Sequence, residues 1–116
     1  MIVDDTEDVR ELLRMQLTML GYRVVEASNG LEAVQIVSKE PPELILMDLC
    51  MPVLDGIEAT RVIRENVGNS DVVIVAFTAQ PCTHSKHLAL AAGCNDYTHK
   101  GLEMAEISKL LEKHLR

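Results

Sequence analysis

Five polar residues stand at or just beyond the ends of apolar runs in the sequence, where they could together bind a phosphoryl group. They are Asp4, Asp5, Asp48, Thr78 and Lys100. A carboxylate at the end of a buried strand is costly unless another charge offsets it. Three carboxylates close together would also repel one another, and a divalent cation would remove that repulsion. Few protein oxygens around an open position suit Mg²⁺, which keeps several waters and shares a phosphate oxygen.

Asp48 is the acid best placed to react with phosphorus. A carboxylate can act as a nucleophile and form an aspartyl phosphate, provided that the metal and other charge-stabilising groups lie within reach. We expect Asp48 to meet that condition, with Thr78 and Lys100 nearby, and we expect Asp4 and Asp5 to be metal ligands. The loop DDTED lacks the glycines of a phosphate cradle, so a phosphoryl group would settle there only with a metal between.

The placement of these residues depends on five apolar runs that alternate with five helical patterns. The runs lie at residues 2–3, 22–27, 44–47, 72–77 and 95–98. The apolar positions of the helical patterns are Val9, Leu12, Leu13, Leu17 and Leu20; Leu31, Val34 and Val37; Ala59, Val62 and Ile63; Leu88, Leu90 and Ala91; and Ile107, Leu110, Leu111 and Leu115. Asp55 is predicted to cap the third helix. Strict alternation predicts an α/β fold with a doubly wound, five-stranded parallel sheet and helices on both faces.

The order of the strands decides which loops meet. Of the two common orders of doubly wound sheets, 2-1-3-4-5 fits five βα units, and ligands of such sheets sit beyond the carboxyl ends of the strands. Neighbouring strands are ~4.8 Å apart. Asp48 is therefore predicted to have Asp4 and Asp5 on one side and Thr78 on the other, with Lys100 one strand further. The first run is short, so its strand is either trimmed or begins upstream.

The composition is typical of one domain that spans residues 1–116. Hydrophobic residues make up 47% and charged residues 25% of the chain, as in a soluble globule, and no apolar run approaches the ~20 residues of a membrane span. A net charge of −7, with one Phe, two Tyr and no Trp, argues against direct nucleic-acid binding. The start turns acidic without a signal peptide, and Cys50, Cys82 and Cys94 form no CxxC pair, which favours reduced thiols and a cytoplasmic location.

Taken together, these stretches resemble the receiver domains of two-component response regulators, over essentially the whole chain. The resemblance rests on the spacing of four motifs: VDD at 3–5, LILMDLCMPVLDG at 44–56, AFTA at 76–79 and AAGCNDYTHK at 91–100. It implies a flavodoxin-like (βα)5 fold similar to that of the chemotaxis receivers. It also implies a signalling domain that is not an enzyme in the ordinary sense, although it assists its own phosphorylation and dephosphorylation.

The resemblance assigns a role to each matching residue. Asp48 would be the phosphoacceptor, and Asp48 and Asp5 would bind Mg²⁺, or Mn²⁺ in its place, directly. The backbone carbonyl of Cys50 would be a third ligand, and Asp4 would act through a water. The other assigned residues are Thr78 and Lys100 on the phosphoryl oxygens, Tyr97 as the aromatic switch residue, and Ala79 as the small residue that leaves the phosphoryl group accessible.

The resemblance also implies partners and a switch. A sensor histidine kinase or a histidine phosphotransfer protein would phosphorylate Asp48, and an output domain or effector protein would respond. Shifting a two-state equilibrium from 1:99 to 99:1 takes about 5.5 kcal/mol, of which hydrogen bonds from Thr78 and Lys100 to a charged group supply roughly 3–6. We expect Thr78 to move towards the phosphoryl group, Tyr97 to occupy the vacated space, and the face around residues 84–113 (helix 4, strand 5 and helix 5) to change its affinity for a partner.

The sequence departs from the family pattern after Lys100. Gly101 stands where the family usually has a proline preceded by a cis peptide bond. Two other functions stay open. One is a phosphorylation-independent interaction domain of the same fold. The other is a Mg²⁺-dependent phosphatase with an aspartyl nucleophile. Such enzymes usually have a second acid, the proton donor, two residues after the nucleophile, where this chain has Cys50.

Two further patterns have simpler interpretations. Cys82, His84 and His87 could suggest a zinc site, but a fourth ligand is not evident in the sequence. The methionines Met15, Met19, Met47 and Met51 are most simply interpreted as packing residues.

Overall fold

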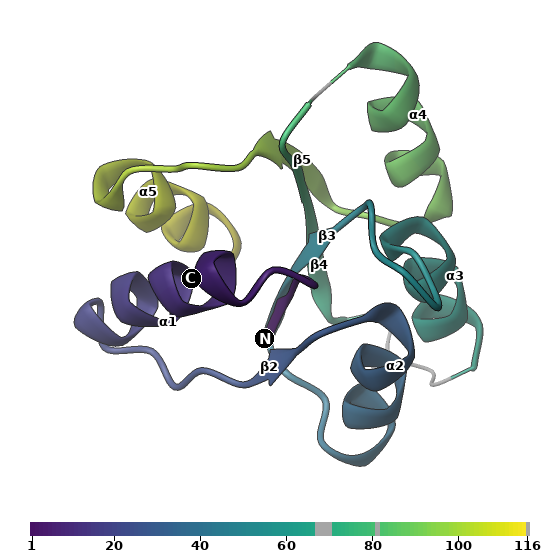
Figure 1. Cartoon of the computed structure of the whole chain (residues 1–116), viewed down its shortest axis with the longest axis horizontal. Helices are drawn as coiled ribbons and strands as arrows, with labels where there is room; N and C mark the ends of the chain where they lie inside the picture. The colour runs from purple at the N-terminus through teal and green to yellow at the C-terminus, as the bar shows by residue number, and fades with distance from the viewer. Residues whose placement is uncertain (67–70, 81, 116) are drawn as a thin grey trace.

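The computed structural model describes residues 1–66, 71–80 and 82–115, and in them five strands alternate with five helices (Figure 1). The elements are β1 (Ile2–Val3), α1 (Glu7–Met19), β2 (Glu26–Ala27), α2 (Gly30–Lys39), β3 (Leu44–Asp48), α3 (Gly56–Asn66), β4 (Val73–Thr78), α4 (Thr83–Ala92), β5 (Asp96–His99) and α5 (Met104–His114). None of these helices has the length and apolar character needed to cross a bilayer.

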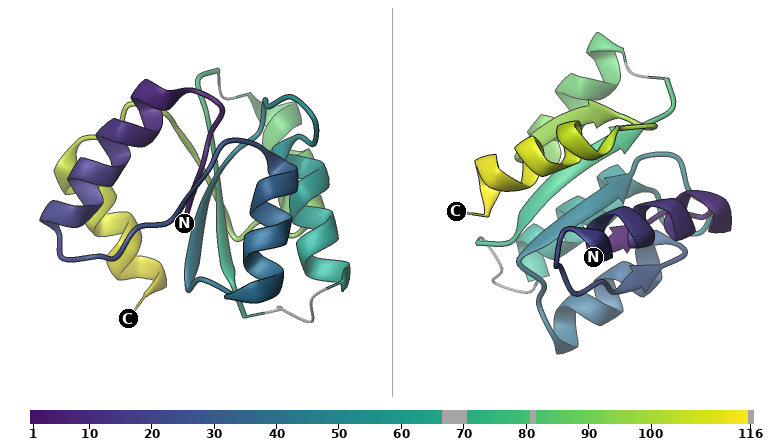
Figure 2. Two further views of the ribbon diagram at one scale, coloured as in Figure 1. Left: turned by 60° about the horizontal axis from the view of Figure 1, so that its bottom comes forward. Right: turned by 90° about the vertical axis from the view of Figure 1, so that its left-hand side faces the viewer.

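The strands form one parallel sheet in the order β2-β1-β3-β4-β5, which confirms the predicted fold class and strand order. Helices α1 and α5 cover one face, while α2, α3 and α4 cover the other (Figures 1 and 2). Because all strands run the same way, their carboxyl ends meet at one edge of the sheet. The strand register brings the end of β1 beside the end of β3, with Val3 opposite Met47.

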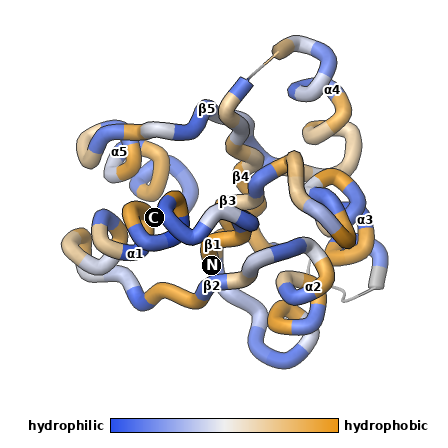
Figure 3. The backbone as a smooth tube through the Cα atoms, in the orientation of Figure 1, coloured by the Kyte–Doolittle hydropathy of each residue, from blue (hydrophilic) through white to orange (hydrophobic). Residues whose placement is uncertain are grey.

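The apolar residues of β3 alternate between two hydrophobic cores. Ile45 and Met47 belong to the core under α2, α3 and α4, whereas Leu44 and Leu46 belong to the core under α1 and α5. All four side chains are buried, and the burial of each stabilises the folded state by roughly 1.5–3 kcal/mol. Figure 3 shows the hydrophobic segments gathered in the central strands. This two-sided burial is what a continuous apolar run predicts for a parallel strand.

The second strand is shorter than its sequence pattern. It comprises Glu26 and Ala27 rather than residues 22–27, because it lies at the edge of the sheet and its neighbour β1 has two residues to pair with. Tyr22 and Val25, outside the pairing, are 37% and 39% exposed. Asp48 and Thr78 are the last residues of β3 and β4, which confirms the predicted ends of those strands.

Several apolar residues predicted to face the core are exposed instead. In α1, Leu13 and Leu17 are buried, but Leu12 is 51% exposed. The packing role predicted for Met15 and Met19 is wrong, because they are 54% and 76% exposed. One face of a helix fits against the sheet, and the pair Leu13 and Leu17, four residues apart, takes that face.

The same correction applies to α2 and α4. Leu31 of α2 is 46% exposed, and Leu88 and Leu90 of α4 are 37% and 41% exposed. Helix α4 instead buries the small residues Ala89 and Ala92, which allow it to lie close to the sheet. The predicted cap of α3 is confirmed, because Asp55 Oδ1 accepts a hydrogen bond from the Glu58 backbone N–H at 2.9 Å.

Val53, in the loop between β3 and α3, adopts a φ of 71° and is 74% exposed. A β-branched residue in this left-handed region is strained, at a cost of about 1–2 kcal/mol. Val53→Gly and Val53→Asn relieve the strain without removing buried surface, and we expect each to raise the free energy of unfolding by about 0.5–1 kcal/mol. Urea denaturation measures the change. Val53→Ala is the control, since it keeps a Cβ and should gain less. Destabilisation by both Gly and Asn would contradict the prediction.

Candidate functional site

Three carboxylates converge at the carboxyl edge of the sheet. Asp4 follows β1 and Asp48 ends β3, so the two lie on neighbouring strands; Asp4 is fully buried and Asp48 is 2% exposed. One oxygen from each of Asp4, Asp5 and Asp48 lies within 4.8 Å of the others. Asp5 is exposed to solvent and forms the outer side of the cluster. The structure therefore brings together the three acids that the sequence predicted to meet.

Lys100 reaches this cluster from beyond the end of β5. Its Nζ lies 2.8 Å from Asp4 Oδ2 and 3.2 Å from Asp48 Oδ2, and it sits 5.4 Å from the centroid of the Phe77 ring. The Lys100 backbone N–H donates to the Thr78 carbonyl at 2.9 Å. Gly101 has a φ of 82°, a conformation that glycine adopts without strain, and the described residues contain no cis peptide bond. The amine thus occupies the predicted place although the family's proline is absent.

Backbone amides hold the two buried carboxylates. Asp48 Oδ1 accepts a hydrogen bond from the Cys50 N–H at 3.2 Å, and Asp4 Oδ1 accepts one from the Thr6 N–H at 2.8 Å. Asp4 Oδ2 is also buried, and its partner is the Lys100 ammonium at 2.8 Å. A carboxylate oxygen has more than one lone pair, so it can also contact a metal ion.

The charges of the cluster do not fully cancel. Burial and the Asp4 carboxylate raise the pKa of Asp48, against the Cys50 N–H and the Lys100 amine, which lower it. Burial alone would lower the pKa of Lys100, but the Asp4 and Asp48 carboxylates overcome that effect and raise it. Lys100 is therefore a firmly charged ammonium that offsets part of the negative charge. The remaining repulsion among the three carboxylates fits a divalent cation with oxygen ligands.

Two glycines allow the backbone around Asp48 to pack closely. A Cβ on Gly56 would collide with the backbone oxygen of Asp48, and a Cβ on Gly30 would collide with that of Leu54. The Gly30 N–H donates to the same Leu54 carbonyl at 3.0 Å. The starts of α2 and α3 are thus fixed against the loop that follows Asp48. The sequence contained Gly56 within its DG pair, but only the fold shows which backbone it approaches.

Thr78 ends β4, which is the neighbour of β3 on the side away from β1. Thr78 is 6% exposed, and its Oγ1 accepts a hydrogen bond from the Gln80 N–H at 3.3 Å. Ala79 and Cys50 are exposed at the surface of the site. The side chain of Tyr97, in β5, is half-buried and packs against the core under α2, α3 and α4.

The hydroxyl group of Tyr97 contacts the first turn of α4. It accepts a hydrogen bond from the Cys82 N–H at 3.1 Å and makes a short hydrogen bond with Ser85 Oγ. Ser85 Oγ itself donates to the Cys82 carbonyl at 3.2 Å. Sequence reasoning missed Ser85, because a serine three residues after a helix cap carries no signal of a distant tyrosine.

The zinc hypothesis is not supported within the described part of the chain. There, the one group of three or more metal-ligating side chains is Asp4, Asp5 and Asp48. Cys82 instead caps α4, since its Sγ accepts a hydrogen bond from the Ser85 N–H at 3.4 Å.

The doubly wound sheet, with buried acids and a lysine at its carboxyl edge, is the arrangement expected of a receiver domain. The family model for the response regulator receiver domain matches residues 1–112. The chain therefore belongs to the receiver domains of two-component response regulators.

Individual proteins agree with this assignment. The response regulator MprA of Mycobacterium leprae is 35% identical over 114 residues, which are 98% of this chain and 49% of that protein. The chain spans about half the length of the curated relatives it matches.

Two solved structures share both the fold and the sequence pattern. One is the receiver domain of sensor histidine kinase PA1611 from Pseudomonas aeruginosa, which has a magnesium ion coordinated in its active site cleft. It is 34% identical, with a TM-score of 0.87 over 97% of this chain and 93% of that one. The other is the receiver domain of Ssk1 from Saccharomyces cerevisiae, crystallised with the histidine phosphotransfer protein Ypd1. It is 35% identical, with a TM-score of 0.89 over 97% and 85% of the two chains.

The raised pKa of Asp48 predicts a pH dependence of stability. Above the ordinary value of 3.8 and below the raised value, folded Asp48 keeps a proton that the unfolded chain has lost. Stability then falls as pH rises through that window. In EDTA, we expect Asp48→Asn to become progressively more stable than the wild type as the pH rises above about 4, measured by urea unfolding. Asp71→Asn, at an exposed carboxyl, is the control and should show no such trend. A constant difference between wild type and Asp48→Asn would contradict the prediction.

Proposed function

We propose that Asp48 accepts a phosphoryl group from a sensor histidine kinase or a histidine phosphotransfer protein in a Mg²⁺-dependent reaction. The observation that carries the proposal is the convergence of Asp4, Asp5 and Lys100 on the Asp48 carboxylate. The crystallisation of the Ssk1 receiver with a phosphotransfer protein supports the partner class. The magnesium ion in the cleft of the Pseudomonas aeruginosa receiver supports the metal.

Each residue of the site has a part in this reaction. A carboxylate oxygen of Asp48 attacks the phosphorus of a phosphohistidine; the P–O bond forms, the P–N bond breaks, and the imidazole leaves with the donor protein. Lys100, already charged, pairs with the phosphoryl oxygens, and Thr78 donates its hydroxyl hydrogen to them. Asp5, Asp48 and the Cys50 carbonyl would hold the cation, with Asp4 acting through a water. The chemistry that Mg²⁺, or Mn²⁺, supplies when bound is neutralisation of charge between the carboxylates and the phosphoryl oxygens.

The same proposal covers the output of the domain. Residues 1–116 act as a single receiver domain that assists its own phosphorylation and dephosphorylation and signals to an output domain or effector protein. The curated relatives are about twice as long, which leaves room for an attached output domain. The net charge of −7 favours a protein partner over direct contact with nucleic acid. The free thiols of Cys50, Cys82 and Cys94 suit the reducing cytoplasm.

Phosphorylation can be measured directly with acetyl phosphate. In the presence of Mg²⁺, we expect intact-protein mass spectrometry to show a gain of one phosphoryl group, because the metal and Lys100 offset the charge of the incoming anion. Asp48→Asn should show no gain. Absence of any gain would favour the phosphorylation-independent interaction domain, and sustained turnover of many acetyl phosphate molecules would favour the phosphatase.

The switch is proposed to run from Thr78 to Tyr97. In the structure Thr78 Oγ1 is engaged by Gln80, and the Tyr97 hydroxyl is held by Cys82 and Ser85. Phosphorylation draws Thr78 towards Asp48, and the space it leaves becomes available to Tyr97. The face formed by α4, β5 and α5 then changes shape, because Tyr97 loses its hydrogen bonds to the first turn of α4.

Weakening the hold on Tyr97 is expected to ease this switch. The Ser85→Ala variant removes one hydrogen bond to Tyr97. In the presence of Mg²⁺, its Tyr97 should therefore respond at a roughly fivefold lower concentration of beryllofluoride, a phosphoryl mimic, than in the wild type. The chain has two tyrosines, so fluorotyrosine NMR of a Tyr22→Phe background reports on Tyr97 alone. Ser38→Ala, on the exposed side of α2, is the control. A Thr78→Ala protein that keeps the full Tyr97 response would contradict the coupling.

A further inference from the structure

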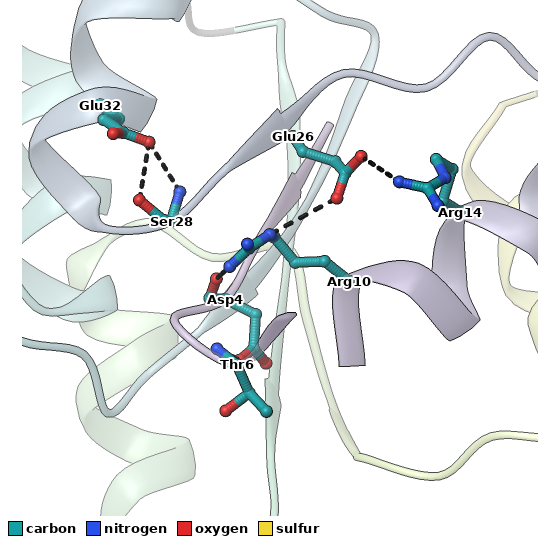
Figure 4. Close-up of polar contacts among 7 residues, drawn as sticks. All are labelled: Asp4, Thr6, Arg10, Arg14, Glu26, Ser28 and Glu32. Carbon is teal, nitrogen blue, oxygen red and sulfur yellow. Dashed lines mark hydrogen bonds and ion pairs between the residues drawn. The ribbon is translucent and has the colours of Figure 1, made fainter. Parts of the chain in front are cut away.

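A positively charged side chain of α1 holds the peptide bond that joins the two acids of the β1–α1 loop. Arg10 Nη1 donates a hydrogen bond to the Asp4 backbone carbonyl at 2.7 Å (Figure 4). That carbonyl belongs to the peptide bond between Asp4 and Asp5, so its orientation sets the direction in which Asp5 leaves the strand. We infer that Arg10 is a positioning residue that orients Asp5 for cation binding, an inference that rests on the proposed function.

The neighbouring contacts show why this hydrogen bond matters for Asp5 more than for Asp4. The Asp4 N–H donates to the Ala27 carbonyl at 3.1 Å, and Asp4 Oδ1 accepts from the Thr6 N–H at 2.8 Å. Asp4 is therefore fixed on three sides once Arg10 binds its carbonyl. Asp5 is exposed, and the hydrogen bonds and ion pairs found among the described residues hold no part of its carboxylate. The direction of Asp5 consequently depends on the peptide plane that Arg10 holds.

Arg10 is itself held in place by an acidic residue of the edge strand. Its Nε lies 3.4 Å from Glu26 Oε1, and its side chain is 18% exposed. Glu26 lies opposite Ile2 in the register of β1 and β2. The second oxygen of Glu26 lies 3.0 Å from Arg14 Nη1, as Figure 4 shows. These contacts link the β1–α1 loop to β2 and to α1 through three residues in a row: Arg14, Glu26 and Arg10.

Arg14 supplies a matched control within the same row. Arg10 and Arg14 lie one turn apart on α1, carry the same charge and pair with the same carboxylate. Arg14 differs in that its recorded contacts are with Glu26 and not with Asp4. Both substitutions remove a positive charge near the acids, a change that by itself strengthens cation binding. Weaker binding after the loss of Arg10 therefore reports lost positioning and not lost charge.

The experiment measures the Mg²⁺ dissociation constant by isothermal titration calorimetry in Arg10→Met, Arg14→Met and the wild type. We expect Arg10→Met to bind Mg²⁺ about fivefold more weakly, the change that loss of one hydrogen bond brings, and Arg14→Met to bind as tightly as the wild type or more so. Urea unfolding shows whether each variant is folded. If Arg10→Met does not fold, Arg10→Lys and Arg14→Lys replace the pair, since lysine keeps the charge but loses the fork that spans Asp4 and Glu26.

Each outcome decides the inference. Weaker Mg²⁺ binding confined to the Arg10 variants supports it, and a changed NMR chemical shift of the Asp5 amide in those variants supports the proposed route through the peptide bond. Equal Mg²⁺ affinities of the Arg10 and Arg14 variants, in a chain whose wild type binds Mg²⁺, would overturn this inference alone. A wild type that binds no Mg²⁺ would overturn the proposed function as well.

Discussion

The repulsion between two buried carboxylates is the constraint on which the rest of this structure depends. The parallel register of β1 and β3 places Asp4 beside Asp48 at one edge of the sheet, where both are almost inaccessible to solvent. Buried like charges are unfavourable unless other charges compensate them. The Lys100 ammonium is that compensation here, since it touches both side chains. One amine against two carboxylates and the nearby Asp5 leaves a negative excess, which is the charge that a divalent cation would neutralise.

The surrounding fold keeps these charges together. Each core covers one face of β3, so the strand that ends in Asp48 is buried from both sides and cannot shift in register without exposing Leu44, Ile45, Leu46 or Met47. Around the site, backbone groups make many of the hydrogen bonds that position the acids. The Cys50 and Thr6 amides fix the two buried carboxylates, and Arg10 fixes the carbonyl between the first two acids. Asp4 and Asp48 are thus held by amides of the loops that follow them and share the Lys100 ammonium.

Much of this arrangement could be predicted from the sequence, for a definite physical reason. Alternating apolar runs and helical patterns permit few topologies once parallel pairing and right-handed crossovers are required. The predicted strand order therefore placed Asp4 next to Asp48, and the structure agrees. The sequence could not show how Arg10 or Ser85 is used, because each acts through a contact with a residue that the fold alone brings near. It also could not show that Met15 and Met19 face solvent, because either side of α1 offers apolar residues to the sheet.

The two glycine contacts make the packing on one side of Asp48 different from the packing on the other. Where Gly30 touches Leu54 and Gly56 touches Asp48, backbone lies directly on backbone, with no side chain between that could change rotamer. The starts of α2 and α3 are therefore held against β3 and the loop that follows it by contacts that no rotamer change can alter. On the other side of Asp48, the Thr78 hydroxyl accepts a hydrogen bond from the Gln80 N–H, and the Tyr97 hydroxyl of β5 contacts Ser85 of α4. These side chains can rotate about single bonds. Under the proposed function, a displacement that starts at phosphorylated Asp48 would therefore pass more readily towards these rotatable side chains than towards the glycine contacts.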